Sequence, residues 1–316
     1  MTRLASIDVG TNSVLLTIAD HVAGVLTPVL ERATVTRLGQ EVDRTGRLHP
    51  DACARTWACL SAYREQMTAA GVTALAAVGT SALRDVEEGR TFLARAEEIL
   101  GQPLEVISGE REAELTFGGA LSGLSVSEGE SLFVFDIGGG STELVWGRLA
   151  ADASGRLRPR IERATSLQLG SVRLHERFRL GDPVEPAALE ALGAQVRDAL
   201  RAYDSAPSGA QRVVGVAGTV TTLAALALGL ERYDGAIVHG ATFERADVWA
   251  LAQRLAGLPL AERIGLAGLD PGRADVIVSG ARLCAELLDW LGASSLQASD
   301  RGVRYGLLEE LSARVG

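Results

Sequence analysis

Two short segments of the chain share the pattern Asp-x-Gly-x-x-Ser, which is suited to holding phosphate groups. Residues 8–16 read DVGTNSVLL and residues 136–144 read DIGGGSTEL. An aspartate at the end of a strand can reach a hard metal ion. A glycine-rich turn allows backbone N–H groups to approach an anion closely, and Ser, Asn and Thr side chains add donors. We therefore expect the two turns to hold one phosphate chain, with Asp8 and Asp136 near a metal ion.

The second copy also carries Glu143, two residues after Ser141. With Asp136 it gives a second carboxylate close to the same turn. The alternative is that Glu143 is a solvent-facing strand residue. Ordinary hairpin turns also use glycine and serine, but two copies in matching positions favour phosphate binding.

The segment 108–121, SGEREAELTFGGAL, contains three acids in the first turns of an expected helix. Ser108 caps this helix, and acids at its start favour the helix dipole. One of the three could also be a general base, because hydrolysis of a phosphoanhydride needs a water that is oriented or deprotonated. Spacing alone does not choose among Glu110, Glu112 and Glu114.

A third glycine-rich segment, GVAGTVTTL at 215–223, runs from an expected strand into an expected helix. Amides at the start of that helix could meet an anion or a nucleotide. A tight strand-to-helix turn that needs glycine explains the same residues equally well.

The elements that must position these segments alternate between strands and helices, and the pattern restarts after residue 121. This alternation predicts an α/β protein of two domains, in which each Asp-x-Gly-x-x-Ser segment is a hairpin turn. The expected strands are 3–9, 14–19, 25–37, 73–78, 104–107, 131–136, 142–149, 212–217 and 294–298. The expected helices are 50–70, 86–100, 109–121, 186–203, 219–229, 244–256, 272–291 and 303–314, and a polar turn is expected at 150–160.

Length and composition fit a two-domain globular enzyme. The chain has 316 residues, with 47% hydrophobic and 22% charged residues, which is enough to bury two cores. No membrane span or signal peptide is apparent, so we expect a soluble, cytoplasmic protein. The three cysteines have no zinc-site spacing and are expected to be buried apolar residues.

The charge of the chain limits its partners. The net charge is −9, which gives no broad basic surface for nucleic acid. All 31 basic residues are arginine, and lysine is absent. A coding bias explains the use of arginine better than a role in phosphate binding does. The absence of lysine excludes a P-loop mechanism, which needs its lysine.

Eight motifs together resemble the exopolyphosphatase/guanosine pentaphosphate phosphohydrolase (Ppx/GppA) family of the actin-like ATPase superfamily, in its short two-domain form. In order, they are IDVGTNS, GTSALRD, ISGEREAEL, FDIGGGSTEL, LGSVRLHERF, GVAGTVTTLAAL, VHG and SDRGVRYGLL. The resemblance covers nearly the whole chain. It implies two ribonuclease-H-like domains with an interdomain cleft, at 1–121 plus 299–316 and at 122–298. It also implies that the C-terminal helix packs back on the first domain.

The resemblance also implies residue roles. The family's catalytic glutamate falls on Glu112, and its acidic pair falls on Asp136 and Glu143, which are associated with Mg²⁺ (or Mn²⁺) and the attacked phosphate. Arg84 matches an arginine that contacts the substrate chain. The phosphate-binding loops fall on Asn12, Ser13, Gly138, Gly139, Gly140 and Ser141.

The function expected from this resemblance is release of orthophosphate from the end of inorganic polyphosphate. Removal of the 5′ γ-phosphate of guanosine pentaphosphate is the first alternative, and a polyphosphate- or nucleotide-binding sensor without turnover is the second. A sugar or acetate kinase of the same superfold is less consistent with the motifs. Arg111 stands where the family commonly has an acid, and the chain ends after the second domain, which favours short substrates. Neither nucleic acid nor a membrane is an expected partner, and a homodimer stays open.

Overall fold

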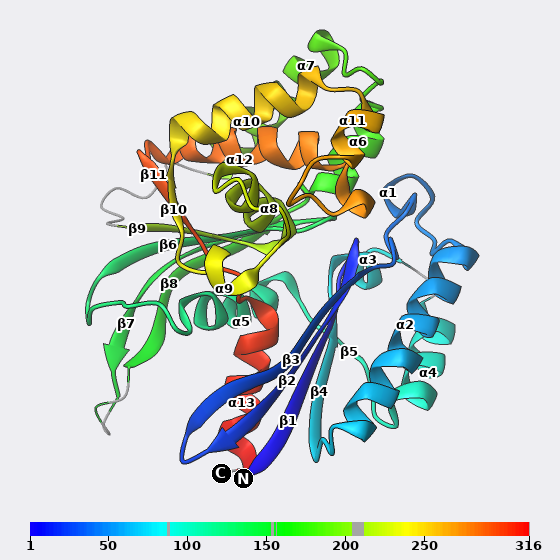
Figure 1. Cartoon of the computed structure of the whole chain (residues 1–316), viewed down its shortest axis with the longest axis vertical. Coiled ribbons are helices and arrows are strands. Elements are labelled where there is room, and N and C mark those ends of the chain that lie inside the picture. Colours follow the sequence, from blue (N-terminus) through cyan, green and yellow to red (C-terminus); the bar gives the residue numbers. More distant parts are fainter. Residues whose placement is uncertain (87–88, 153–154, 156, 204–211, 316) are drawn as a thin grey trace. The chain divides into compact units, whose positions relative to one another are not determined.

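The computed structural model describes residues 1–86, 89–152, 155, 157–203 and 212–315. These residues form two compact units, Met1–Gly119 with Val303–Gly316 (unit 1) and Ala120–Gly302 (unit 2). Each unit is a mixed sheet with helices (Figure 1), so the α/β fold class predicted from the sequence is confirmed. The finer domain bounds given above stay a prediction.

The sheet of unit 1 has the strand order β3-β2-β1-β4-β5 among the described residues. Its strands are β1 (Thr2–Val9), β2 (Ser13–Val22), β3 (Val25–Val35), β4 (Ala74–Gly79) and β5 (Glu105–Val106). β1 and β2 are antiparallel and are joined by the first Asp-x-Gly-x-x-Ser turn, whereas β1, β4 and β5 run parallel. The first copy is therefore a hairpin turn, as predicted.

Both faces of the unit 1 sheet are covered by helices (Figure 1). The helices are α1 (Val42–Thr45), α2 (Pro50–Ala69), α3 (Ser81–Arg84), α4 (Gly89–Leu100), α5 (Gly109–Leu121, which passes into unit 2) and α13 (Val303–Val315). Ala5, Ile7 and Val9 of β1 pack in one cluster with α2 and α4, and Leu4 packs with α13 on the opposite face. Because side chains alternate along a strand, Asp8 belongs to the face of α13. Packing of the C-terminal helix on unit 1 agrees with what the resemblance implies.

The sheet of unit 2 repeats this plan. Among the described residues its strand order is β10-β11-β9-β6-β7-β8, so β8-β7-β6-β9-β11 matches β3-β2-β1-β4-β5. The strands are β6 (Ser131–Ile137), β7 (Thr142–Ala151), β8 (Leu157–Leu167), β9 (Arg212–Val216), β10 (Thr242–Glu244) and β11 (Ser295–Ala298). β6 and β7 form the hairpin that carries the second copy.

A layer of helices packs on one face of this sheet. Phe133, Phe135 and Ile137 of β6 point into it, so Asp136 belongs to the opposite face. The layer is formed by α6 (Ser171–Phe178), α7 (Pro186–Tyr203), α8 (Ala217–Ala227), α10 (Arg245–Gly257) and α12 (Ile277–Leu291). The shorter elements of unit 2 are α9 (Gly235–Val238), α11 (Leu260–Ile264) and the 3₁₀ turn η1 (Pro271–Arg273).

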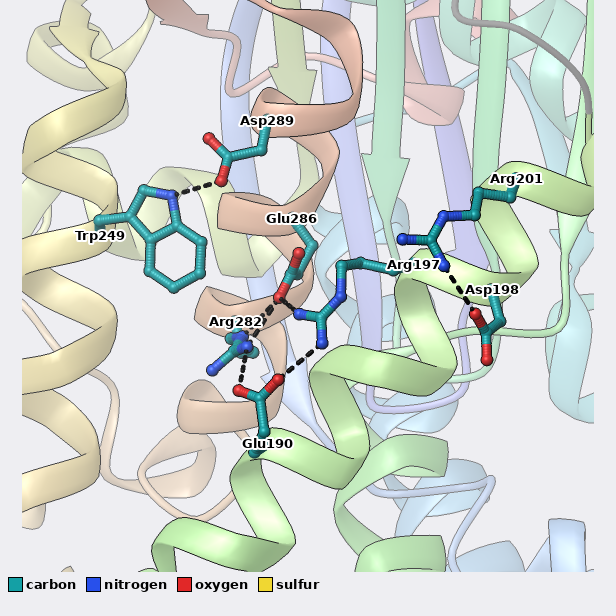
Figure 2. Close-up of polar contacts among 8 residues, drawn as sticks. All are labelled: Glu190, Arg197, Asp198, Arg201, Trp249, Arg282, Glu286 and Asp289. Atoms are coloured by element: carbon teal, nitrogen blue, oxygen red, sulfur yellow. Dashed lines mark hydrogen bonds and ion pairs between the residues drawn. The ribbon is translucent and has the colours of Figure 1, made fainter.

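An ion-pair network ties α7 to α12 within this layer (Figure 2). Glu286 of α12 is 3% exposed and accepts hydrogen bonds from Arg197 of α7 and Arg282 of α12. Both arginines also bind Glu190, and Arg282 stacks over the ring of Trp249 on α10. A buried carboxylate needs such partners to offset its desolvation. The network fixes α12, whose Ser279 hydroxyl donates to the carbonyl of Ser171 at the start of α6.

Several predicted elements need correction. The helix expected at 272–291 is the short turn η1 followed by α12, because Asp270 accepts from the Gly272 amide and starts a separate turn. The polar turn expected at 150–160 is wrong at both ends, where β7 and β8 continue, and its residues 153, 154 and 156 lie outside the described ones. β8 and α6 were not predicted. The charged residues of β8 suit an exposed edge strand and hide the strand signal.

Candidate active site

The hairpin turn of unit 2 is closed by one backbone hydrogen bond. The Gly138 amide donates to the Ser141 carbonyl over 3.0 Å. A Cβ atom on Gly138 would lie 3.1 Å from that same oxygen, which is tighter than ordinary van der Waals contact. Position 138 therefore has little room for a side chain, which favours glycine.

The carbonyls of this turn are all held from the side of α6. Ser171 N–H donates to the Gly138 carbonyl, and the amides of Val172 and Arg173 donate to the Gly139 carbonyl. The Gly140 carbonyl accepts from the Arg173 side chain, Nε to O 2.6 Å. The turn thus satisfies the free N–H groups at the start of α6, a helix without a side-chain cap.

The direction of the turn's own amides follows from these bonds. In a trans peptide the N–H points opposite to the C=O. With three successive carbonyls facing α6, the N–H groups of Gly139, Gly140 and Ser141 face away from it. In the described part of the chain, these three amides donate to no backbone carbonyl. We call this run of three amides the nest, because successive backbone N–H groups in a turn can bind an anion. Since α6 packs on the face opposite Asp136, the nest points toward the face that carries Asp136.

Gly170 supports the nest from behind, and the sequence pattern alone did not single it out. It precedes α6 and lies flat against the nest, since a Cβ atom on it would be 2.3 Å from the Gly139 carbonyl oxygen and 2.5 Å from the Gly140 nitrogen. Any side chain there would displace the turn. In LGSVRL a lone glycine precedes a helix pattern, but the sequence does not show what that glycine contacts.

Asp136 and Glu143 are brought together by strand register. They are directly paired across β6 and β7, so both side chains lie on the same face. Asp136 is 8% exposed and Glu143 is 1% exposed. Glu143 Oε1 accepts from the hydroxyls of Ser141 (2.8 Å) and Ser166 (2.7 Å). The alternative that Glu143 faces solvent is therefore wrong.

The hairpin turn of unit 1 has the same closing bond. The Gly10 amide donates to the Ser13 carbonyl over 3.0 Å, and the Asn12 carbonyl accepts from the amides of Thr36 and Arg37. The Thr11 carbonyl accepts from Gly39 N–H. By the same peptide geometry, the N–H groups of Asn12 and Ser13 face away from this support.

The residue opposite the aspartate differs in unit 1. Asp8 pairs across the hairpin with Leu15, where unit 2 has Glu143. Unit 1 instead has a buried carboxylate on α5. Of the three acids at the start of this helix, Glu112 is buried, with 7% exposed, whereas Glu110 and Glu114 are exposed. Ser108 caps the helix through its hydroxyl, which accepts from the Arg111 amide, as predicted.

Glu112 is paired with Arg84, so two predicted site residues meet inside unit 1. Arg84 Nη1 lies 2.6 Å from Glu112 Oε2 and also donates to the Ile107 carbonyl. Burial raises the pKa of the Glu112 carboxyl, and the charge and hydrogen bond of Arg84 lower it in part. Within the described residues, the buried Nη2 of Arg84 has no hydrogen-bond partner, which leaves one donor for an incoming oxygen.

The donor atoms fit a hard divalent metal. Among the described residues no three His, Cys, Asp or Glu side chains gather in one group. Mg²⁺ does not require that, because it commonly binds one or two carboxylates and completes its shell with water and substrate phosphate. The Asp136–Glu143 pair supplies two such carboxylates. In unit 1, Asn12 Oδ1 is a buried oxygen with no hydrogen-bond partner in the described residues, near the end of the strand that carries Asp8.

The third glycine-rich segment begins α8. A Cβ atom on Gly218 would fall within the Arg273 guanidinium, so the present position of this arginine leaves no room for a side chain there. This favours the interpretation of the segment as a tight turn.

Comparison with known proteins places the chain among phosphatases. The model of the Ppx/GppA phosphatase family matches residues 17–314. The chain belongs to the Ppx/GppA phosphatase family. It is 39% identical to exopolyphosphatase 2 of Mycobacterium tuberculosis, over 99% of both chains. It is 31% identical to a guanosine-5'-triphosphate,3'-diphosphate pyrophosphatase of Vibrio parahaemolyticus, over 97% of this chain and 59% of that relative.

The fold agrees with this family. The crystal structure of the Aquifex aeolicus Ppx/GppA family member is 31% identical, with a TM-score of 0.81 and coverage of 100% of this chain and 99% of that one. The actin-like ATPase fold expected from the motifs is therefore confirmed. None of the helices that the structure describes is long and apolar enough to span a bilayer.

Proposed function

We propose that this phosphatase is an exopolyphosphatase that hydrolyses the terminal phosphoanhydride bond of inorganic polyphosphate and releases orthophosphate. The observation that carries the proposal is the turn of unit 2, where three aligned amides face the side of the sheet that bears two buried carboxylates. The similarity of the chain to exopolyphosphatase 2 of Mycobacterium tuberculosis, over 99% of both chains, supports the choice of substrate.

The two hairpin turns bind phosphate oxygens in this proposal. In unit 2 the donors to phosphate are the amides of Gly139, Gly140 and Ser141, and in unit 1 the matching donors are the amides of Asn12 and Ser13. Because the carbonyl side of each turn is already hydrogen-bonded, the amides need little rearrangement on binding. The buried Arg84 Nη2 donates to a further phosphate oxygen or to the attacking water.

Asp136 and Glu143 would hold a Mg²⁺ or Mn²⁺ ion in unit 2, and Asp8, at the matching position of unit 1, stays a predicted metal-binding residue. When bound, the ion neutralises charge on the anhydride oxygens. The hydroxyls of Ser141 and Ser166 orient one oxygen of Glu143, much as outer partners orient metal-binding carboxylates elsewhere.

Glu112 is the general base. Its carboxylate accepts a proton from water as the water oxygen bonds to the terminal phosphorus. The bridging P–O bond breaks, and its electron pair stays on the polyphosphate, which is shortened by one unit. A general base must be basic, and burial raises the pKa of Glu112 while the charge and hydrogen bond of Arg84 lower it in part.

Phosphate release from polyphosphates of several lengths and from guanosine pentaphosphate, with and without Mg²⁺, tests the proposal. We expect metal-dependent release from polyphosphate that stops after exhaustive chelation. Release that continues unchanged after chelation contradicts the metal role. No release from any polyphosphate contradicts the proposed activity itself.

Guanosine pentaphosphate is the second candidate substrate. The similarity to the Vibrio parahaemolyticus enzyme over almost the whole chain favours it, and the bond cleaved is of the same kind. A higher kcat/KM for guanosine pentaphosphate than for any polyphosphate would establish it. A binding sensor is disfavoured because it has no need of a buried base such as Glu112. A cytoplasmic location and a homodimer stay predictions, which cell fractionation and sedimentation can test.

A further inference from the structure

The nest of unit 2 depends on one charged side chain in a way that the turn of unit 1 does not. When the sequences of the two hairpins are aligned, Asn12 corresponds to Gly140. The Asn12 carbonyl is held by two backbone amides, those of Thr36 and Arg37. The Gly140 carbonyl accepts from no backbone amide in the described residues, and the Arg173 guanidinium takes that place.

We propose that Arg173 is a positioning residue for phosphate binding, acting through the peptide that joins Gly140 to Ser141. Its Nε atom holds the Gly140 carbonyl at 2.6 Å. The Ser141 N–H belongs to the same planar peptide, so fixing the carbonyl fixes the direction of that donor. Arg173 also donates its backbone amide to Gly139, so one residue orients two successive amides of the nest.

The charge of Arg173 strengthens this effect. A hydrogen bond from a guanidinium to a carbonyl is shorter and stronger than one from a neutral donor. It draws electron density toward the carbonyl oxygen and makes the N–H at the other end of the peptide a better donor. The half-buried side chain begins in the first turn of α6, whose neighbour α12 is fixed by the network of Figure 2. The donor therefore comes from a rigid support.

This inference rests on the proposed function, since it concerns how the same site binds phosphate. The test uses the full chain labelled with ¹⁵N, and orthophosphate, the expected product, as the probe. In the wild type, the amide signals of Gly139, Gly140 and Ser141 should shift on addition of orthophosphate. In Arg173→Met the Ser141 signal should lose this response, and the Kd for orthophosphate should rise by about 10- to 100-fold. The KM for polyphosphate should rise in parallel.

Two further variants separate positioning from charge and from folding. Arg173→Gln keeps a neutral donor of similar length and should recover part of the affinity, whereas Arg177→Met removes a charge from the exposed end of the same helix and should behave like the wild type. If Arg173→Met does not fold, Arg173→Gln alone must show the weakened affinity.

The outcomes distinguish the two proposals. Unchanged orthophosphate affinity in Arg173→Met and Arg173→Gln overturns the role of Arg173 while the exopolyphosphatase proposal stands. An equal loss in Arg177→Met shows a general charge effect and also overturns it. A wild-type chain that neither binds orthophosphate nor hydrolyses polyphosphate overturns both.

Discussion

The two hairpins of this phosphatase share a plan but differ in what surrounds them. Both have the same closing hydrogen bond and the same strand order around them. Unit 1 places Leu15 opposite its aspartate and holds its turn by backbone amides, whereas unit 2 places Glu143 there and adds the Arg173 side chain. The difference gives unit 2 a second carboxylate beside its turn, whereas the base proposed for unit 1, Glu112, comes from a separate helix.

The largest effect is expected from replacing Glu112, the general base proposed for unit 1. Glu112→Gln keeps the shape of the side chain and removes its basic oxygen. We expect kcat to fall by roughly 10²- to 10⁴-fold with little change in substrate affinity. Steady-state kinetics on polyphosphate measures this. Glu110→Gln and Glu114→Gln are matched controls on the same helix, since both residues are exposed. Should either control be inactive while Glu112→Gln turns over normally, the base has been misassigned.

The next effect tests whether Glu143, which has no acidic counterpart in unit 1, contributes to metal binding. Glu143→Gln should lower activity by on the order of 100-fold or more at limiting Mg²⁺, because outer partners of metal ligands already contribute 10- to 100-fold. Part of the loss should be recovered at high Mg²⁺. Leu15→Gln places the same amide side chain at the matching position of the unit 1 hairpin and should have a much smaller effect. Equal losses in the two variants would remove the distinction between the hairpins.

A third comparison concerns the glycines that support each turn. A Cβ atom on Gly170 would collide with backbone atoms of the nest, whereas on Gly39 it would meet the Cγ2 end of the Thr11 side chain. Gly170→Ala should therefore misplace the nest and lower kcat/KM by about 100-fold. Gly39→Ala should cost less, because a side chain can move aside. Gly257→Ala, where a Cβ atom would meet open space, should keep full activity in the same assay.

The smallest expected effect is a shift in the pH dependence of kcat, caused by two residues of unit 1. Because the pKa of Glu112 is raised, its ionised form appears only above the usual range of a glutamate, and the acid limb of kcat should lie there. Arg84 lowers this pKa, so Arg84→Gln should move the acid limb to higher pH. Folding favours protonated Glu112, so its contribution to stability is complete below the ordinary pKa. That contribution is lost as the pH rises through the raised value.

The control for this shift is a matched change of charge. Arg95 forms an exposed ion pair with Glu98, and Arg95→Gln should leave the pH profile of kcat unchanged. An acid limb that stays in place in Arg84→Gln argues that another group limits the rate at low pH.

Local sequence determined the hairpins, most helices and the family. Asp-x-Gly-x-x-Ser between two apolar runs predicts a turn because only a few residue types suit a tight backbone reversal. The cap at Ser108 follows from its spacing of three residues from the Arg111 amide, which a sequence shows directly. All three cysteines are buried, as expected. The roles predicted for the site residues stay predictions.

The tertiary structure decided what lies behind each turn and how each acid is paired. Gly170 and Arg173 meet the nest only because β8 and α6 return the chain to it, and no local pattern encodes that approach. Glu112 could not be separated from its two acidic neighbours by sequence spacing, because all three favour a helix start equally. Glu112 differs from Glu110 and Glu114 in being buried and in pairing with Arg84, which lies 28 residues earlier in the chain. Such contacts depend on how different helices and strands pack together, whereas sequence patterns indicate mainly the structure within a single helix or strand.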